Sequence, residues 1–338
     1  MGSYLPGIPP KRSASHDRVR LLLGQVSPNP RWLALYLCQI SCLATLLIGA
    51  CIMTIDYEAL KRFPFEDRVH SYDERDTMLY ALGIGLGADP LDERELRFVF
   101  EADLQALPTM AVTLATSRPW LHRPESGVTF SQMLHGEQWI ELHRPIQPSG
   151  ELVGKTSMDE IVDKGPGKGA LLYMSRVVSD KASGEPNFTA RQTLFCRADG
   201  GVGGPVTDSR PVHPLPERAP DLSVDVPTLE RQPLIYRLSG DRNPLHADPA
   251  TAKSAGFDRP ILHGLCTFGI AGYAILKSVA DYQPEALRSI GARFASPVFP
   301  GETIRTEIWE EGSGRVGFRC RAVERDLVVV NNGIAELG

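Results

Sequence analysis

Residues 264–282, GLCTFGIAGYAILKSVADY, predict a helix that is apolar on nearly every side. Phe268, Ile270 and Ile275 would lie on different faces of this helix, and none of the faces is polar. A helix without a polar face is expected to be buried. Its first N–H groups, beginning at Gly264, would have no partner within the helix. We therefore expect an enclosed helix whose N-terminus faces a binding site.

Short alternating or apolar runs follow this helix and predict antiparallel strands. A sheet wrapped around a buried helix is the hot-dog arrangement. The predicted strands are SIGARFASPVF (289–299), ETIRTEIWEE (302–311), RVGFRCRAVE (315–324) and LVVVNNGIAEL (327–337).

An earlier part of the chain approximately repeats this order and predicts a duplicated α+β module. Its helix is expected between Asp73 and Leu86, where Met78, Leu79 and Leu82 have helical spacing. QPLIYRLSG (232–240) is expected to begin the second unit as a strand. Strands of the first unit are expected in RELRFVFE (94–101), AVTLAT (111–116), GEQWIELHRPI (136–146), TSMDEIVDKGPGKGALLYMSRVVSD (156–180, with a turn) and NFTARQTLFCRA (187–198).

The N-terminal segment has a different composition from the rest of the chain. Trp32–Ile55 carries no charge and is long enough to cross a bilayer. The favoured interpretation is a working protein that starts at Met53. A membrane anchor at residues 32–52 and a cleaved signal peptide are the alternatives.

Domain boundaries follow from these patterns. We expect an extension at residues 1–52, a first hot-dog module at 53–198, a Gly/Pro-rich linker at 199–230 and a second module at 231–338.

The overall charge argues against nucleic acid as a partner, because the net charge is −5 and the pI is about 5.9. The 6 cysteines have neither metal-ligand nor redox spacing, which favours free thiols in a reducing cytoplasm. GIGLGA (83–88) ends a predicted helix, so it is not a dinucleotide site. GGVGG (200–204) lacks the Lys-Ser/Thr of a phosphate loop and is interpreted as a flexible connection.

The loop SGDRNPLHADP (239–249) places an acid, an amide and an imidazole close together. Asn-Pro favours a bend, so Asp241, Asn243 and His246 can converge. Asp248-Pro249 then predicts the start of a short helix. An acid and an imidazole that face a helix N-terminus form a candidate proton-transfer site.

The segment YRLSGDRNPLHADPATAKSAGFDRPILHGLCTFG (236–269) resembles the signature of the MaoC-type (R)-specific enoyl-CoA hydratases, in particular the hydratase region of the peroxisomal D-bifunctional protein. The resemblance extends from about Tyr57 to Leu337. It implies a double hot-dog fold, an enoyl-CoA substrate, and no metal or cofactor. Further matching segments are YALGIG, LRFVFE, LPTMAV, LHGEQWIEL, DKGPGKGALL and GGVGG.

The resemblance implies a role for each residue of the motif. Asp241 and His246 would activate the water that adds to the β-carbon of a trans-2-enoyl thioester, while a proton reaches the α-carbon. Asn243 would fix the water or the pair, and the Gly264 N–H would hold the thioester oxygen. Cys266 lies one turn into the buried helix and is not expected to be a nucleophile.

The first half has no equivalent loop, so the resemblance implies that it accommodates the acyl chain. His135 and Glu137 are expected to be structural. Lys164 and Lys168 are candidate contacts for the CoA phosphates, with a solvated turn as the competing interpretation.

Fatty acid β-oxidation is the expected context, with (R)-specific hydration to (R)-3-hydroxyacyl-CoA as the activity. We also expect a homodimer, a separate 3-hydroxyacyl-CoA dehydrogenase and a cytoplasmic location, or a peroxisomal one in a eukaryote. A dehydratase for carrier-bound substrates and a non-catalytic thioester-binding protein remain as alternatives.

Overall fold

The computed structural model describes residues 55–117, 120–205 and 208–338. They belong to one compact unit, Met53–Gly338. The predictions for residues 1–52 lie outside the described residues. Among the helices that the structure describes, none is long and apolar enough to span a membrane.

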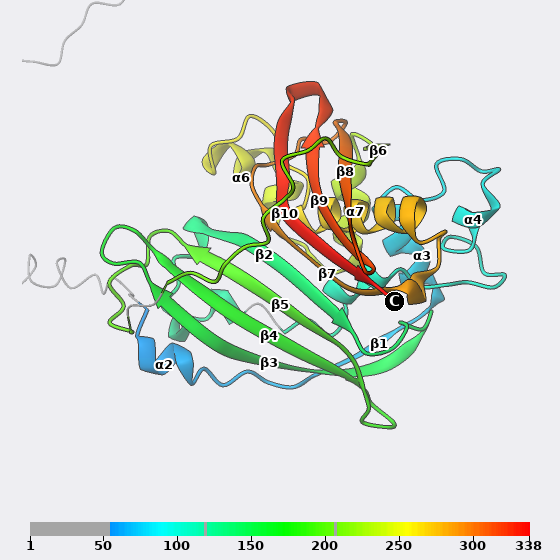
Figure 1. The fold of residues 1–338 in the computed structure, drawn as a ribbon. Helices are drawn as coiled ribbons and strands as arrows, with labels where there is room; N and C mark the ends of the chain where they lie inside the picture. Colours follow the sequence, from blue (N-terminus) through cyan, green and yellow to red (C-terminus); the bar gives the residue numbers. More distant parts are fainter. Residues whose placement is uncertain (1–54, 118–119, 206–207) are drawn as a thin grey trace, which may run out of the picture. The chain divides into compact units, whose positions relative to one another are not determined.

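The strands form one antiparallel sheet in the order β1-β3-β4-β5-β2-β7-β10-β9-β8-β6 (Figure 1). The pairing of β2 with β7 joins the strands of the two halves into this single sheet. The strand bounds are β1 Arg68–Tyr72, β2 Met133–Leu142, β3 Gly150–Asp163, β4 Ala170–Asp180, β5 Pro186–Cys196, β6 Leu222–Pro227, β7 Leu287–Phe294, β8 Thr303–Gly312, β9 Arg315–Ala322 and β10 Leu327–Leu337.

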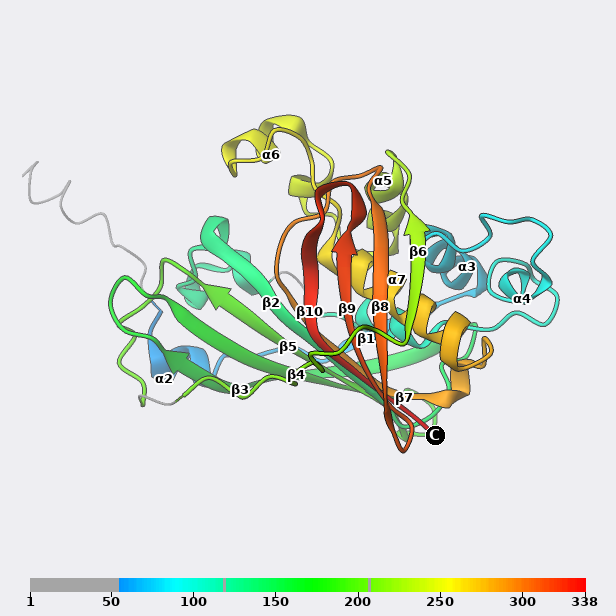
Figure 2. The ribbon, with the colours of Figure 1, turned by 45° about the horizontal axis from the view of Figure 1, so that its top comes forward.

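The long apolar helix is present as α7 (Gly264–Val279), and every residue from Cys266 to Leu276 is buried. The strands of the second half curve around it, as Figure 2 shows for β6, β8, β9 and β10. The double hot-dog prediction is thereby confirmed, with both halves contributing strands to the sheet. In this half the sheet and η1 (Pro108–Val112) of the first half together remove α7 from water.

The first half is built differently, because its helix does not lie in its own sheet. The predicted helix forms as α3 (Glu74–Gly83), which begins with a capping box at Asp73. It packs against α5 (Gln232–Tyr236) of the second half, and Gln232 Nε2 donates a hydrogen bond of 2.6 Å to the Gly83 carbonyl.

The remaining described helices are short. Four of them, η1 to η4, are 3-10 turns that lie between α4 and β2. The short helices are α2 (Tyr57–Lys61), α4 (Glu93–Leu96), α6 (Pro249–Ser254), η1 (Pro108–Val112), η2 (Trp120–His122), η3 (Pro124–Ser126), η4 (Phe130–Gln132), η5 (Arg237–Ser239), η6 (Pro244–His246), η7 (Pro284–Ala286) and η8 (Val323–Arg325).

Three predicted strands are wrong. Residues 94–101 form part of α4 and the turns that follow it, and residues 111–116 belong to η1 and a turn. Residues 232–240 form α5 and η5, because Pro233 occupies the first helical turn, where its missing N–H costs nothing.

The predicted linker is partly ordered structure. Residues 222–227 form β6 at the edge of the sheet, paired with β8. Upstream, the N–H groups of Gly201 and Gly203 donate to the Asp163 carboxylate, so the glycine-rich segment is held against the β3–β4 turn.

Close packing around α7 depends on small residues. A Cβ added at Gly272 would lie 2.4 Å from Cγ2 of Thr109 in η1, well inside van der Waals contact. The glycine therefore allows η1 to approach the helix that forms the core of the second half.

We expect Gly272→Ala to destabilise the protein by about 1–3 kcal/mol. In an open helical position the same change would stabilise it, because alanine favours helix. The free energy of unfolding from urea titrations tests this. Thr109→Ser removes the clashing methyl group, so the double variant should recover much of the loss; a stabilising Gly272→Ala would contradict the packing argument.

Candidate functional site

The loop after η5 is sharply bent, as its Asn-Pro sequence predicts. Gly240 has φ +124°, a conformation that residues with a side chain rarely adopt. Asn243 is the N-cap of η6, and its Oδ1 accepts from the Leu245 N–H at 3.1 Å. The Asn243 N–H donates to Asp241 Oδ1 at 3.1 Å. These bonds hold Asp241 and His246 on one short turn.

His246 is buried, and its hydrogen bond defines its tautomer. Nδ1 lies 2.9 Å from the Ile261 carbonyl oxygen, which can only accept, so Nδ1 carries the proton. The lone pair is therefore on Nε2. Burial lowers the pKa of His246, although the Ile261 carbonyl and Asp241 oppose this effect. The imidazole is consequently neutral at pH 7 and able to accept a proton.

A second histidine, His263, packs against His246. Their rings stack with centroids 3.8 Å apart and an interplanar angle of 27°. His263 Nε2 donates to the Asp241 backbone carbonyl at 3.1 Å, and its buried Nδ1 has no partner among the described residues. Burial and the neighbouring His246 lower the pKa of His263 to about 4.

The three side chains form one cluster. A carboxylate oxygen of Asp241 and ring nitrogens of His246 and His263 all lie within 4.8 Å of one another. Sequence reasoning did not assign His263 a role, although ILHG precedes the helix directly. The sequence could not show that His263 stacks on His246, because this contact depends on how the loop folds back onto the start of α7.

The start of α7 completes the arrangement. Gly264 is the first residue of α7, so its N–H has no acceptor within the helix, and it has no partner among the other described residues. Gly264 is exposed to the cavity, and a Cβ there would lie 3.2 Å from the Phe294 ring. The cavity can therefore receive a group that accepts a hydrogen bond from this N–H.

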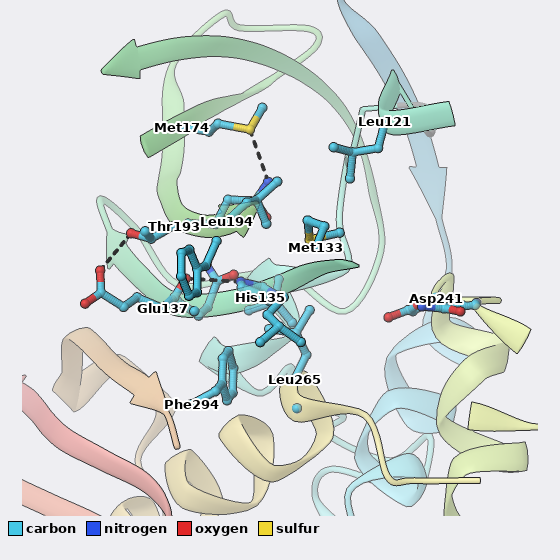
Figure 3. A pocket seen from close by; sticks show the side chains of 18 of the residues that line it. Leu121, Met133, His135, Glu137, Met174, Thr193, Leu194, Asp241, Leu265 and Phe294 are labelled. Carbon is cyan, nitrogen blue, oxygen red and sulfur yellow. Dashed lines mark hydrogen bonds between the residues drawn. The ribbon is translucent and has the colours of Figure 1, made fainter. Parts of the chain in front are cut away.

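A cavity of about 1090 Å³ extends from this cluster into the first half. Asp241, Asn243, His246 and Gly264 line it on one side. Figure 3 shows apolar side chains gathered away from Asp241. They are Leu121, Met133, Met174 and Leu194.

His135 and Glu137 lie on β2, near the junction with β7. His135 Nε2 donates to the Glu137 carbonyl at 3.1 Å, and burial lowers the pKa of His135 to about 4. The Glu137 carboxylate accepts from Arg293 and Thr193, each at 2.7 Å. These groups line the cavity. The Glu137 carboxylate connects β2 to β5 and β7, whereas the His135 bond lies within β2. A structural role for both residues stays a prediction.

The predicted CoA-contacting lysines are separated in the structure. Lys164 lines the cavity and donates to Ser209 Oγ at 3.2 Å, whereas Lys168 is exposed in the β3–β4 turn and does not line the cavity. Their role in binding phosphate stays a prediction.

Cys266 is buried within α7, and its Sγ donates to the Gly83 carbonyl at 3.4 Å. Burial raises the pKa of this thiol, which keeps it protonated. It is therefore unsuited to act as a nucleophile.

Comparison with known proteins finds a matching family model for each half of the chain. The model described as MaoC like domain matches residues 211–332, and the model described as MFE-2 hydratase 2 N-terminal domain matches residues 70–198. The chain is 42% identical to 3-hydroxyacyl-thioester dehydratase Y of Mycobacterium tuberculosis over 80% of this chain and 94% of that protein. It is 41% identical to the peroxisomal enoyl-CoA hydratase 2 of Arabidopsis thaliana, over 77% of this chain and 89% of that protein. The crystal structure of a MaoC-like dehydratase from Phytophthora capsici superposes on this structure with a TM-score of 0.74 at 35% identity. The match covers 84% of this chain and 99% of that chain.

The buried imidazoles predict that the protein loses stability in acid. His135, His246 and His263 all have a pKa lowered from 6.5, so the unfolded chain takes up protons before the folded one does. The free energy of unfolding should therefore fall as the pH drops from about 6.5 towards about 4. Urea titrations across this range test the prediction.

His135→Gln serves as the matched variant, because the amide can still donate to the Glu137 carbonyl but does not titrate. Its stability should depend less steeply on pH. An unfolding free energy that stays constant over the range would contradict the assignment of neutral imidazoles.

Proposed function

Because this chain belongs to the family that combines an MFE-2 hydratase 2 N-terminal domain with a MaoC-like domain, we propose that it is an (R)-specific enoyl-CoA hydratase. It adds water reversibly to a trans-2-enoyl-CoA and gives the (R)-3-hydroxyacyl-CoA. The observation that carries the proposal is the meeting of a neutral His246, the Asp241 carboxylate and the free Gly264 N–H at one cavity.

The chemistry follows from the hydrogen-bonding capacity of these groups. A water molecule between Asp241 and His246 donates one O–H to the carboxylate and the other to Nε2. As its oxygen bonds to the β-carbon, Nε2 takes up the proton. The α-carbon then receives a proton from the imidazolium on the same face, so one water is added in total.

Negative charge develops on the thioester oxygen when the β-carbon is attacked. The Gly264 N–H is free to donate to this oxygen, and it lies at the positive end of a 16-residue helix. A donor placed in this way contributes about 3 kcal/mol to the transition state. The absence of a side chain at Gly264 leaves space between the helix start and Phe294 for the thioester.

The first half supplies space for the acyl chain. Its part of the cavity is lined by apolar side chains such as Leu121, Met133 and Met174. The described residues of this half contain no helix comparable to α7, and residues of its strands, such as Met174 of β4 and Leu194 of β5, line the cavity.

A dehydratase for carrier-bound substrates is the second candidate. The dehydratase relative with 42% identity favours it, and the reaction is the same one in reverse. Comparing acyl-CoA with acyl-carrier protein as substrate separates the two candidates. A non-catalytic binding protein is disfavoured by the neutral Nε2 and the carboxylate at the cavity.

The product requires a further enzyme. A secondary alcohol at the β-carbon is oxidised by a 3-hydroxyacyl-CoA dehydrogenase, so we propose that a separate dehydrogenase consumes the product in β-oxidation. A homodimer, and a cytoplasmic or, in a eukaryote, peroxisomal location, stay predictions.

We expect Asp241→Asn and His246→Ala each to lower kcat by about 10²–10⁴-fold. The double variant should be scarcely slower than either single variant, because both groups act on one water. Asp248→Asn is the matched control, since Asp248 only caps α6. Normal turnover in a folded Asp241→Asn protein, or multiplicative losses in the double variant, would contradict the shared role.

The direct test follows the loss of enoyl-thioester absorbance with crotonyl-CoA and a long-chain trans-2-enoyl-CoA. We expect turnover, and a product that only an (R)-specific dehydrogenase oxidises. Oxidation by an (S)-specific enzyme would overturn the stereochemical assignment. Turnover of acyl-carrier substrates alone would favour the dehydratase.

A further inference from the structure

Arg176 is a cation in the wall of the acyl cavity. It lies on β4, two residues beyond Met174, and therefore on the same face of the sheet. Both side chains line the cavity. Arg176 is deep in the protein yet retains accessible surface, which is consistent with a side chain that faces the cavity.

No carboxylate neutralises Arg176 within the part of the chain that the structure describes. Nη2 donates to the carbonyls of Ala111 at 3.0 Å and Val112 at 3.4 Å, and the buried Nε has no partner among the described residues. Burial lowers the pKa of Arg176 to about 10, so the side chain still carries its charge at neutral pH.

The fold alone does not require this charge. The two carbonyls need only a neutral hydrogen-bond donor, which a glutamine could supply. An uncompensated buried charge is costly, and such groups in proteins are usually paired. The missing partner is therefore expected to be an anion that enters the cavity.

Thr156 provides a second donor beside the arginine. It is the residue opposite Arg176 in the β3–β4 pairing, so the two side chains are neighbours on one face. Thr156 also lines the cavity, and its hydroxyl makes no hydrogen bond among the described residues. A guanidinium and a hydroxyl together match the two oxygens of a carboxylate.

We propose that Arg176 and Thr156 bind a carboxylate at the far end of the acyl chain, so that the enzyme accepts trans-2-enoyl thioesters whose chain ends in a carboxylate. This inference rests on the proposed function and specifies its substrate class. The thioester lies at Gly264, the chain crosses the apolar region around Met133 and Met174, and its terminal carboxylate contacts Arg176.

The test compares two series of trans-2-enoyl-CoA substrates of increasing length, one ending in a methyl group and one in a carboxylate. For the full chain, kcat/KM of the carboxylate series should show a maximum at one length, where the terminus reaches Arg176. At that length Arg176→Gln should lower kcat/KM by at least about tenfold for the carboxylate substrate. It should leave the methyl-ended substrate unchanged or improve it.

Two further variants make the result specific. Arg176→Lys keeps a cation and should retain part of the preference. Lys155→Met removes a cation from the neighbouring strand, but Lys155 is exposed on the opposite face and contacts Asp67, so it should not change selectivity. Arg176→Gln keeps a donor for the Ala111 and Val112 carbonyls, and its melting temperature reports whether the fold is retained.

The outcomes separate this inference from the proposed function. Turnover of methyl-ended substrates without a carboxylate preference at any length would overturn only the role of Arg176. A preference that survives in Arg176→Gln would also overturn it. Absence of turnover with every enoyl-CoA would instead refute the proposed function.

Discussion

The enclosure of α7 is the constraint on which the site depends. Its buried residues run without interruption from Cys266 to Leu276, so the sheet must wrap around the helix to remove them from water. The first turn is left open towards the cavity, and the last turn, residues 277–279, is also partly exposed. The Gly264 N–H has no partner among the described residues because it belongs to the first residue of the helix, and the packing around α7 holds it in a fixed position.

The two halves have used the same sheet differently. In the second half α7 fills the curve of the strands. In the first half α3 packs against α5 instead, and residues of the strands line the cavity. Helix α3, which does not lie in the sheet of its own half, thus stabilises the segment before the Asp241 loop, because Gln232 of α5 is hydrogen-bonded to Gly83 of α3. The contacts between α3 and α5 therefore link the half that lines much of the cavity to the loop that carries Asp241.

Much of this arrangement could be predicted from the sequence. The helix α7, the strands β2 to β5 and β7 to β10, and the bend at Asn243 have strong local signals, namely periodicity over many residues or an Asn-Pro pair. The failures were short apolar runs such as residues 232–240, where periodicity does not distinguish a strand from a buried helix. The edge strands β1 and β6 were missed because they are short and carry polar residues.

The parts of the site that were not predicted depend on tertiary contacts. His263 could be assigned only once the loop was seen to fold onto the helix start. Arg176 lies in a strand whose sequence gives no sign of which face is covered. A charged side chain on a strand usually faces bulk solvent, and only the position of the cavity shows that Arg176 faces the cavity instead.

Ile261 affects the site through two independent groups. Its backbone carbonyl determines which nitrogen of His246 carries the proton, while its side chain lines the cavity. A carbonyl is present whatever residue occupies the position. A substitution at residue 261 can therefore change the shape of the cavity beside His246 while the carbonyl that fixes the protonation of the base is kept, so shape and proton transfer can be adjusted separately at a single position.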